Sequence, residues 1–386
     1  MHPRQRGESG SCRAIVAALG VGLALGAASA RAAVTVVEND KGKLDVELGG
    51  MFSASTSGQD SAPDQKSRVY DFALRRVRVT ANATASKWLS LTLQVGQDNV
   101  GSKIATEDTG FKIKDAYANL KSRDELQLAV GQFKVPFLRI NLEGDLKGLL
   151  IDRPLASALR PAREISRDIG AMLWGNYQGL QYRLGLFDGA DQDQKNSTSS
   201  PRLSGRAVYN FYSLEKGLSY TGTSVGEERV FQVGGDFDWQ NDRLDARDDK
   251  DYVAQSRDYR AGAVEVYYDQ PFKKTWAATI EAAWVGRHDD YNDPTLAQRK
   301  VRGYYVQGGV LLPGKVGPGR VMVDFRNEYT KGTRGAATTE IKQNALGGTW
   351  FVKGQSRKLM IDYTWRREDP KELDNDELKA AFVAVF

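Results

Sequence analysis

Apolar and polar residues alternate along this chain in segments of about ten residues. Four segments show the period of two clearly, and their apolar members are Leu89, Leu91, Leu93 and Val95; Leu180, Tyr182, Leu184 and Leu186; Val321, Val323 and Phe325; and Leu359, Ile361, Tyr363 and Trp365. Successive side chains of a β-strand point to opposite faces, so each segment is expected to be a strand with one apolar face. The other face carries charges such as Arg183, Asp324 and Asp362 and suits water. One face in lipid and one in water is typical of a transmembrane β-barrel.

The same pattern predicts sixteen antiparallel strands. We place them at 42–53, 70–83, 86–98, 111–121, 125–134, 168–176, 179–188, 203–212, 228–240, 257–269, 274–286, 300–312, 319–330, 339–352, 357–367 and 377–386. Long and short connections alternate between them, as expected when the loops at one barrel rim are long and the turns at the other are short. The connection 213–227 breaks this rule, because it is long but falls among the short turns. Strand edges cannot be left open in lipid, so the barrel must be closed.

A soluble β-sandwich would also have alternating strands, and the aromatic residues argue against it. Trp and Tyr concentrate near the expected strand ends, as in the girdles of membrane barrels; they are Trp88, Tyr177, Trp239, Trp276 and Trp365. The last strand has an apolar face that ends in Phe386, a feature expected to be recognised by the barrel-assembly machinery. We therefore expect outer-membrane lipid around the barrel.

Residues 1–33 are predicted to be a cleaved signal peptide, and residues 34–386 the barrel domain. Arg4, Arg6 and Arg13 precede an uncharged apolar stretch at 14–27, and small-residue cleavage sites follow at Ala30 and at Ala33. The signal would carry the chain to the periplasm and from there to the outer membrane of a Gram-negative cell. Its removal leaves 54 − 4 = 50 basic and 49 − 1 = 48 acidic residues, so the mature protein is nearly neutral and no nucleic-acid partner is expected.

Several short motifs together resemble the phosphate-selective porin O and P family. They are LRRVRV at 74–79, LQVGQDN at 93–99, KDAY at 114–117, VGQFKVPF at 130–137, RDIGAML at 167–173, GRAV at 205–208 and GYYVQ at 303–307. The resemblance is strong over residues 70–212 and looser after them. It implies an outer-membrane porin, a passive diffusion channel with sixteen strands, a homotrimeric assembly, and a third loop folded into the pore. Here that loop would be 135–167.

A pore selects solutes by its width and by the charges at its narrowest part. Arginine suits oxyanions because its planar fork donates two parallel hydrogen bonds and stays charged. The candidates at the constriction are Lys134, Arg139, Arg153, Arg160, Arg163 and Arg167, joined on the inner wall by Arg76, Arg78, Arg183 and Arg206. The same loop carries the acids Glu143, Asp145, Asp152, Glu164 and Asp168. A preference for small anions such as phosphate and a pore of balanced charge both remain open. Arg75 falls on the lipid face unless the register shifts there.

Other functional classes find less support. After residue 33 the chain has one histidine, His288, with no nucleophile at a suitable spacing, and no cysteine. We therefore expect no enzymatic activity, no cysteine-based metal site and no cofactor. The alternative to a porin is a barrel that conducts nothing and serves a structural or adhesive role.

Overall fold

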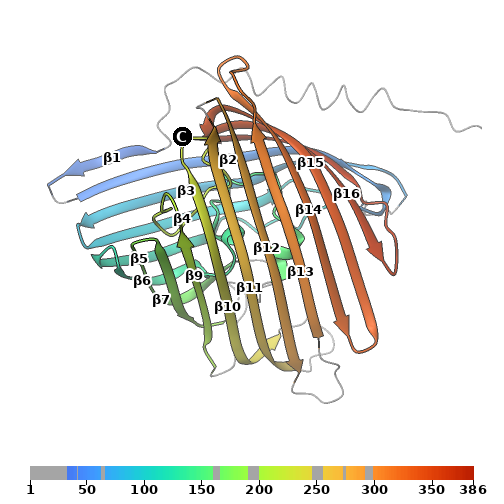
Figure 1. Ribbon diagram of the computed structural model, residues 1–386, viewed down its shortest axis with the longest axis horizontal. Helices are drawn as coiled ribbons and strands as arrows, with labels where there is room; N and C mark the ends of the chain where they lie inside the picture. The colour runs from blue at the N-terminus through green and yellow to red at the C-terminus, as the bar shows by residue number, and fades with distance from the viewer. Residues whose placement is uncertain are drawn as a thin grey trace, which may run out of the picture.

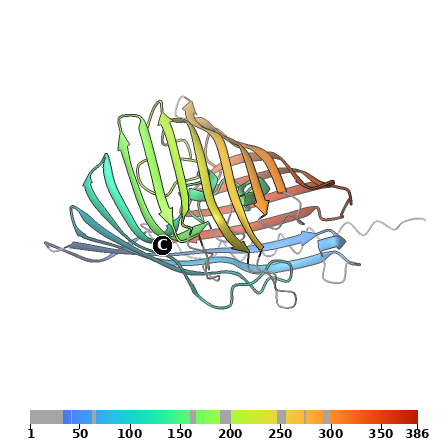
Figure 2. The ribbon, with the colours of Figure 1, turned by 90° about the horizontal axis from the view of Figure 1, so that it is seen from below.

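The strands of the chain form one antiparallel sheet that closes into a barrel (Figures 1 and 2). This computed structural model describes residues 33–40, 42–61, 66–159, 166–189, 200–245, 255–272, 275–291 and 299–386. Each strand from β2 to β17 pairs with the next, and β17 pairs with β2. The predicted all-β barrel of sixteen antiparallel strands is therefore confirmed.

Ten of the sixteen barrel strands are longer than predicted, and several of them extend beyond the expected ends toward the long loops, whereas β4, β6, β8, β9 and β17 are one or two residues shorter. Their bounds are β2 Gly42–Ser57, β3 Val69–Ser86, β4 Leu89–Val100, β5 Lys112–Arg123, β6 Leu126–Lys134, β7 Arg167–Tyr177, β8 Leu180–Phe187, β9 Arg202–Asn210, β10 Val230–Asp245, β11 Gln255–Phe272, β12 Trp276–Tyr291, β13 Arg299–Leu311, β14 Arg320–Arg334, β15 Ala337–Gln355, β16 Arg357–Asp369 and β17 Glu377–Val385. Backbone pairing in a hairpin continues past the end of the apolar pattern, which is why the pattern underestimates strand length.

An additional short strand, β1 (Val34–Asn39), lies outside the sixteen. It pairs with the start of β2, with Val34 opposite Val46. Phe386 exchanges two backbone hydrogen bonds with Leu48 just beyond that point (3.0 and 2.8 Å). β1 thus continues along β2 where β17 stops, and covers an edge that would otherwise be open.

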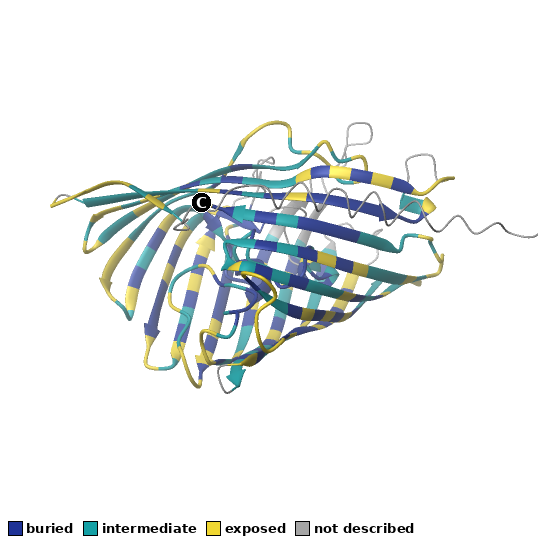
Figure 3. Cartoon of the chain, turned by 90° about the horizontal axis from the view of Figure 1, so that it is seen from above, coloured by how far each residue is buried: buried dark blue, intermediate teal, exposed yellow. Residues whose placement is uncertain are grey.

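The two faces of the barrel differ as the alternation predicted. Along β8, Leu184 and Leu186 are 47% and 53% exposed, whereas Gln181 and Arg183 between the apolar positions are buried. The same holds on β14 and β16, where Phe325 and Ile361 are exposed and Asp324 and Asp362 are buried. The alternating bands of exposed and buried residues in Figure 3 show this along most strands. The outer surface is apolar, and the charged residues face inward.

A β-bulge corrects the placement of Arg75 on the lipid face. Leu74 pairs with Phe52 and Arg76 pairs with Met51, so β3 has one residue more than β2 at this point. A bulge lets two consecutive side chains point to the same side. Arg75 and Arg76 both turn inward, where Arg75 forms an ion pair with Asp152. The register of β3 therefore shifts at Arg75, which is the alternative to the lipid face that the sequence left open.

Two connections have contacts with inward-facing side chains of distant strands. The first, 135–166, is described except for residues 160–165 and contains the short helices α2 (Arg139–Leu142) and η3 (Leu155–Leu159), which lie within the barrel outline in Figures 1 and 2. Its apolar residues pack on β11, β12 and β13 through Phe137 and Ile140, and on β2, β16 and β17 through Leu146 and Ile151.

The second such connection is 211–229, which we call the inserted segment. It joins β9 to β10 at the rim of the short turns. Its Val225 packs with Leu149 of the first connection on β12–β15, and Tyr220 is only 2% exposed. The unusual length of 213–227 is therefore explained by its contacts inside the barrel. Among the described residues, no helix is long and apolar enough to cross a membrane.

Candidate pore constriction

A cavity of about 250 Å³ lies between the inner wall of β2–β8 and residues 144–147 of the first connection. Five cationic side chains line it: Arg78, Lys134, Lys147, Arg167 and Arg183. Three acidic side chains also line it, namely Glu47, Asp115 and Asp145. The apolar residues of the first connection pack on β11, β12 and β13 and on β2, β16 and β17.

Most of these cations converge on Asp145. Its Oδ1 atom is 3.0 Å from Lys134 Nζ and 3.3 Å from Arg153 Nη2. Its Oδ2 atom is 2.9 Å from Arg78 Nε and 3.3 Å from Arg167 Nη2. Four cations from β3, β6, β7 and the first connection therefore share one carboxylate, and we call this group the Asp145 cluster.

The neighbours of the Asp145 cluster extend it along the wall. Arg76 donates a hydrogen bond to the Asp145 carbonyl at 2.8 Å, and Asp115 accepts two bonds from Arg167 at 2.9 and 3.0 Å. Arg78 also pairs with Asp98 at 2.7 Å. Asp152 pairs with Arg75 and Lys379 on the β17 side. These bonds join the first connection to the wall of the cavity at several points.

The charge on Asp145 is stabilised by its surroundings. Burial by itself disfavours the ionised carboxylate. Lys134, Arg167 and Arg78 outweigh this effect and hold the pKa of Asp145 well below its usual range. Asp145 therefore stays ionised, and its single negative charge offsets only part of the positive charge of the four cations around it.

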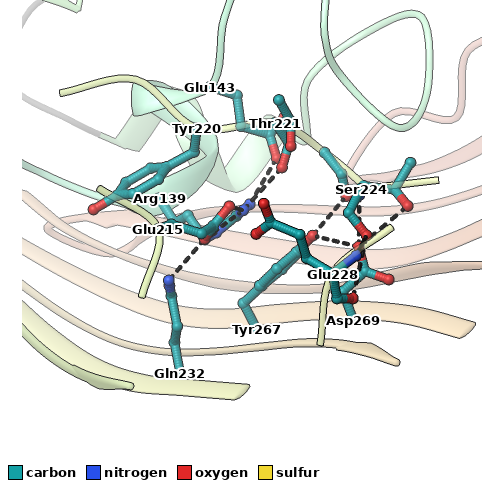
Figure 4. Close-up of polar contacts among 12 residues, drawn as sticks. Arg139, Glu143, Glu215, Tyr220, Thr221, Ser224, Glu228, Gln232, Tyr267 and Asp269 are labelled. Carbon is teal, nitrogen blue, oxygen red and sulfur yellow. Dashed lines mark hydrogen bonds and ion pairs between the residues drawn. The ribbon is translucent and has the colours of Figure 1, made fainter. Parts of the chain in front are cut away.

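The other predicted arginines gather around Tyr220 instead. The guanidinium carbons of Arg139, Arg183 and Arg206 lie 5.1, 4.9 and 5.1 Å from the centre of its ring. Figure 4 shows Arg139 beside Tyr220. Arg183 and Arg206 each donate a hydrogen bond of 2.9 Å to the Tyr220 hydroxyl, which itself donates to Gln181. We call this group the Tyr220 cluster.

The ten predicted candidates thus separate into two groups and an undescribed pair. Arg76, Arg78, Lys134, Arg153 and Arg167 come together around Asp145. Arg139, Arg183 and Arg206 come together around Tyr220, with Arg183 also reaching the cavity. Arg160 and Arg163 lie outside the described residues.

Sequence reasoning missed Tyr220 and its neighbour Glu215. Their connection looked like an overlong turn, and no periodicity marks residues that fold back into a barrel. The signal that was present is the length itself, because long connections without secondary structure are uncommon unless they are functional or disordered.

The structure places the remaining histidine away from the cavity. His288 Nε2 lies 2.7 Å from Asp290 Oδ1 near the long-loop end of β12. In the described part of the chain, no group of three or more His, Cys, Asp or Glu side chains is arranged to hold a metal ion.

Comparison with known proteins places this barrel among porins. A family model described as "Phosphate-selective porin O and P" matches residues 46–385. A protein of Aquifex aeolicus (strain VF5), described as uncharacterized, is 26% identical over 351 residues, which cover 81% of this chain and 79% of that protein.

Solved outer-membrane structures share the fold at low sequence identity. OmpF of Salmonella typhi, in complex with daunomycin, has a TM-score of 0.63 at 13% identity and covers 92% of this chain and 100% of its own. OmpT of Vibrio cholerae in its trimer form has a TM-score of 0.60 at 11% identity, with coverage of 90% and 100%. An anion-selective porin from Comamonas acidovorans has a TM-score of 0.56 at 10% identity, with coverage of 89% and 100%.

Proposed function

Because the chain belongs to the phosphate-selective porin O and P family, and is thus an outer-membrane porin, we propose that it is a non-enzymatic passive diffusion channel that prefers small anions. The observation that carries the preference is the Asp145 cluster, in which Arg78, Lys134, Arg153 and Arg167 share a single carboxylate beside the cavity. An anion near this group meets more positive than negative charge.

The charges that line the cavity and the geometry of its guanidinium donors both favour anions. The cavity is lined by five cationic and three acidic side chains, and an ion in a narrow pore passes close to each uncompensated charge, where the Coulomb interaction is strongest. Arg167 and Arg78 are guanidinium donors, which suit the oxygen atoms of phosphate or related oxyanions. Phosphate is the first oxyanion to test, because the family description names it.

The surroundings of the channel are also part of the proposal. Residues 1–33 act as an export signal that is removed after Ala30 or Ala33, and the barrel-assembly machinery inserts the remaining chain. Three copies form a homotrimer, as the trimer form of the similar Vibrio cholerae protein suggests. The first connection acts as the inward-folded third loop, and its contacts with β2, β16 and β17 support this role.

The test is single-channel recording of the refolded protein in a planar bilayer. A chloride salt gradient gives the permeability ratio from the reversal potential, and phosphate is then added to look for block of the chloride current. Anion-biased conductance with phosphate block supports an oxyanion channel. Anion-biased conductance without block supports a general anion porin. Conductance without anion bias overturns the preference, and the absence of conductance from a folded barrel favours the structural or adhesive alternative.

A further inference from the structure

The inserted segment (211–229) enters the barrel from the rim opposite the long loops and meets the first connection there. We propose that this segment is a positioning element of the pore, in which Glu215, Tyr220 and Gly222 hold residues 139–149 in place and thereby set the width of the constriction. This inference rests on the proposed function as a conducting channel. It gives a role to the contacts that this long connection makes inside the barrel.

The first point of attachment is the pair formed by Glu215 and Arg139 (Figure 4). Arg139 Nη2 lies 2.8 Å from Glu215 Oε1 and also donates a 2.8 Å hydrogen bond to the Thr221 carbonyl. The same guanidinium bonds to Glu143 Oε1 at 3.0 Å, and its carbon atom lies 3.4 Å from the centre of the Tyr267 ring. Arg139 is 1% exposed, so these bonds replace water that it has lost. Arg139 therefore links the inserted segment to helix α2.

The second point of attachment is Tyr220. Its hydroxyl accepts hydrogen bonds from Arg183 on β8 and Arg206 on β9, both 2.9 Å long. Its backbone pairs with the first connection, because Tyr220 N donates to the Leu142 carbonyl at 3.2 Å and Gly144 N donates to the Tyr220 carbonyl at 2.9 Å. Tyr220 thus connects the wall of the barrel directly to the residues that precede Asp145.

The third point of attachment is the close approach at Gly222. Its backbone N–H donates to the Lys147 carbonyl at 2.8 Å. A Cβ atom at this position would lie 2.4 Å from the backbone nitrogen of Leu149, a separation that real Cβ atoms do not show. Any larger residue must push the two connections apart.

These attachments act on the residues that border the cavity. Gly144, Asp145 and Lys147 line it, and each is within three residues of a backbone hydrogen bond to the inserted segment. The far end of the segment is fixed as well, since Ser224 N donates to Asp269 of β11 at 2.6 Å and Gln355 Nε2 donates to the Thr223 carbonyl at 2.9 Å. Loss of one attachment should let residues 143–149 sample displaced positions while the barrel stays closed.

Three variants test this in planar bilayers: Glu215→Gln, Tyr220→Phe and Gly222→Ala. The first two each weaken a hydrogen bond of a buried charged group, and the third forces the connections apart without changing charge. Glu227→Gln is the control for charge, because Glu227 is exposed in the same segment. Gly50→Ala is the control for glycine, because an added Cβ there meets only Arg76 O, at 3.9 Å. Heat-dependent migration in gels shows which variants fold, and a failure of one variant leaves the other two informative.

We expect the open-channel current to fluctuate among additional conductance levels in the three variants. The time spent in these levels should rise about tenfold, because a buried charge-assisted bond is weakened in Glu215→Gln and Tyr220→Phe and the two connections are forced apart in Gly222→Ala. Both controls should match the unmodified protein. If all folded variants keep the unmodified conductance, level structure and permeability ratio, the positioning role is overturned. If the unmodified protein itself does not conduct, the proposed function fails instead, so the two failures are distinguishable.

Discussion

Replacing Asp145 with asparagine should make the channel more anion-selective. Among the residues that the structure describes, Asp145 is the one carboxylate that the four cations Arg78, Lys134, Arg153 and Arg167 share, at 2.9–3.3 Å. The Asn side chain keeps nearly the same shape and removes one negative charge. The surrounding positive charge is then no longer offset, and a passing anion is stabilised while a passing cation is destabilised.

The size of the effect follows from Coulomb's law. For an ion about 6 Å from the removed charge, in a water-like dielectric, the change is about 0.7 kcal/mol and has opposite signs for anion and cation. The difference of about 1.4 kcal/mol corresponds to about tenfold in the permeability ratio. Screening by 0.1 M salt, where the Debye length is about 10 Å, reduces this difference. We therefore expect the anion-to-cation permeability ratio to increase about three- to tenfold.

The assay is the reversal potential of single channels under a salt gradient, compared with the unmodified protein and with Asp124→Asn. Asp124 is a matched control, because it pairs with Lys121 and Lys216 at the short-turn rim and does not line the cavity. An unchanged permeability ratio in folded D145N protein would refute the reasoning. If D145N does not fold, Asp115→Asn provides a second test, since Asp115 pairs with Arg167 and also lines the cavity.

Three further outcomes are expected. Leu184→Arg places a charge on the lipid face near the middle of β8 and should lower the free energy of unfolding by about 2–4 kcal/mol, measured by denaturant titration in lipid vesicles. Gly131→Ala should lower it by about 1–3 kcal/mol, because Gly131 has a φ of +130° and its Cβ would lie 2.3 Å from the Ala116 carbonyl oxygen; equal stability of Gly131→Ala and Gly50→Ala would contradict this. The depressed pKa of Asp145 means that its charge is present above the unfolded-state value and is lost only as pH falls through the lower folded value. The difference in selectivity between D145N and unmodified channels should therefore persist below about pH 4, where an ordinary Asp side chain is mostly protonated, and its disappearance near pH 4 would show that Asp145 titrates normally.

Much of this barrel is determined by local sequence. The alternation around Leu184 and Arg183 assigns each residue to lipid or water, because the side chains of a strand point to opposite faces. The same pattern gave all sixteen barrel strands within a few residues at most of their ends. The motifs between residues 70 and 212 identified the family that the comparison confirmed.

The alternation of apolar and polar residues gave a wrong or incomplete prediction in two situations. In one, a single extra residue changed the register; in the other, the chain left the sheet. At Arg75, one extra residue in β3 reverses the face, and nothing in the residue types of 74–76 distinguishes a bulge from a regular strand. β1 was missed as well; it lies outside the sixteen barrel strands and forms a short hairpin with the start of β2, with Val34 opposite Val46.

The partners of the candidate cations were decided only by the tertiary structure. The sequence supplied ten basic residues and their acids, but Arg78 and Asp145 are 67 residues apart in the chain, and Arg139 and Glu215 are 76 residues apart. Connections have no period that fixes where their side chains point, and an ion pair depends on distances across the barrel. The sequence thus determined the strands and their two faces, whereas the closed barrel decided which cations surround Asp145 beside the cavity and which hold Tyr220.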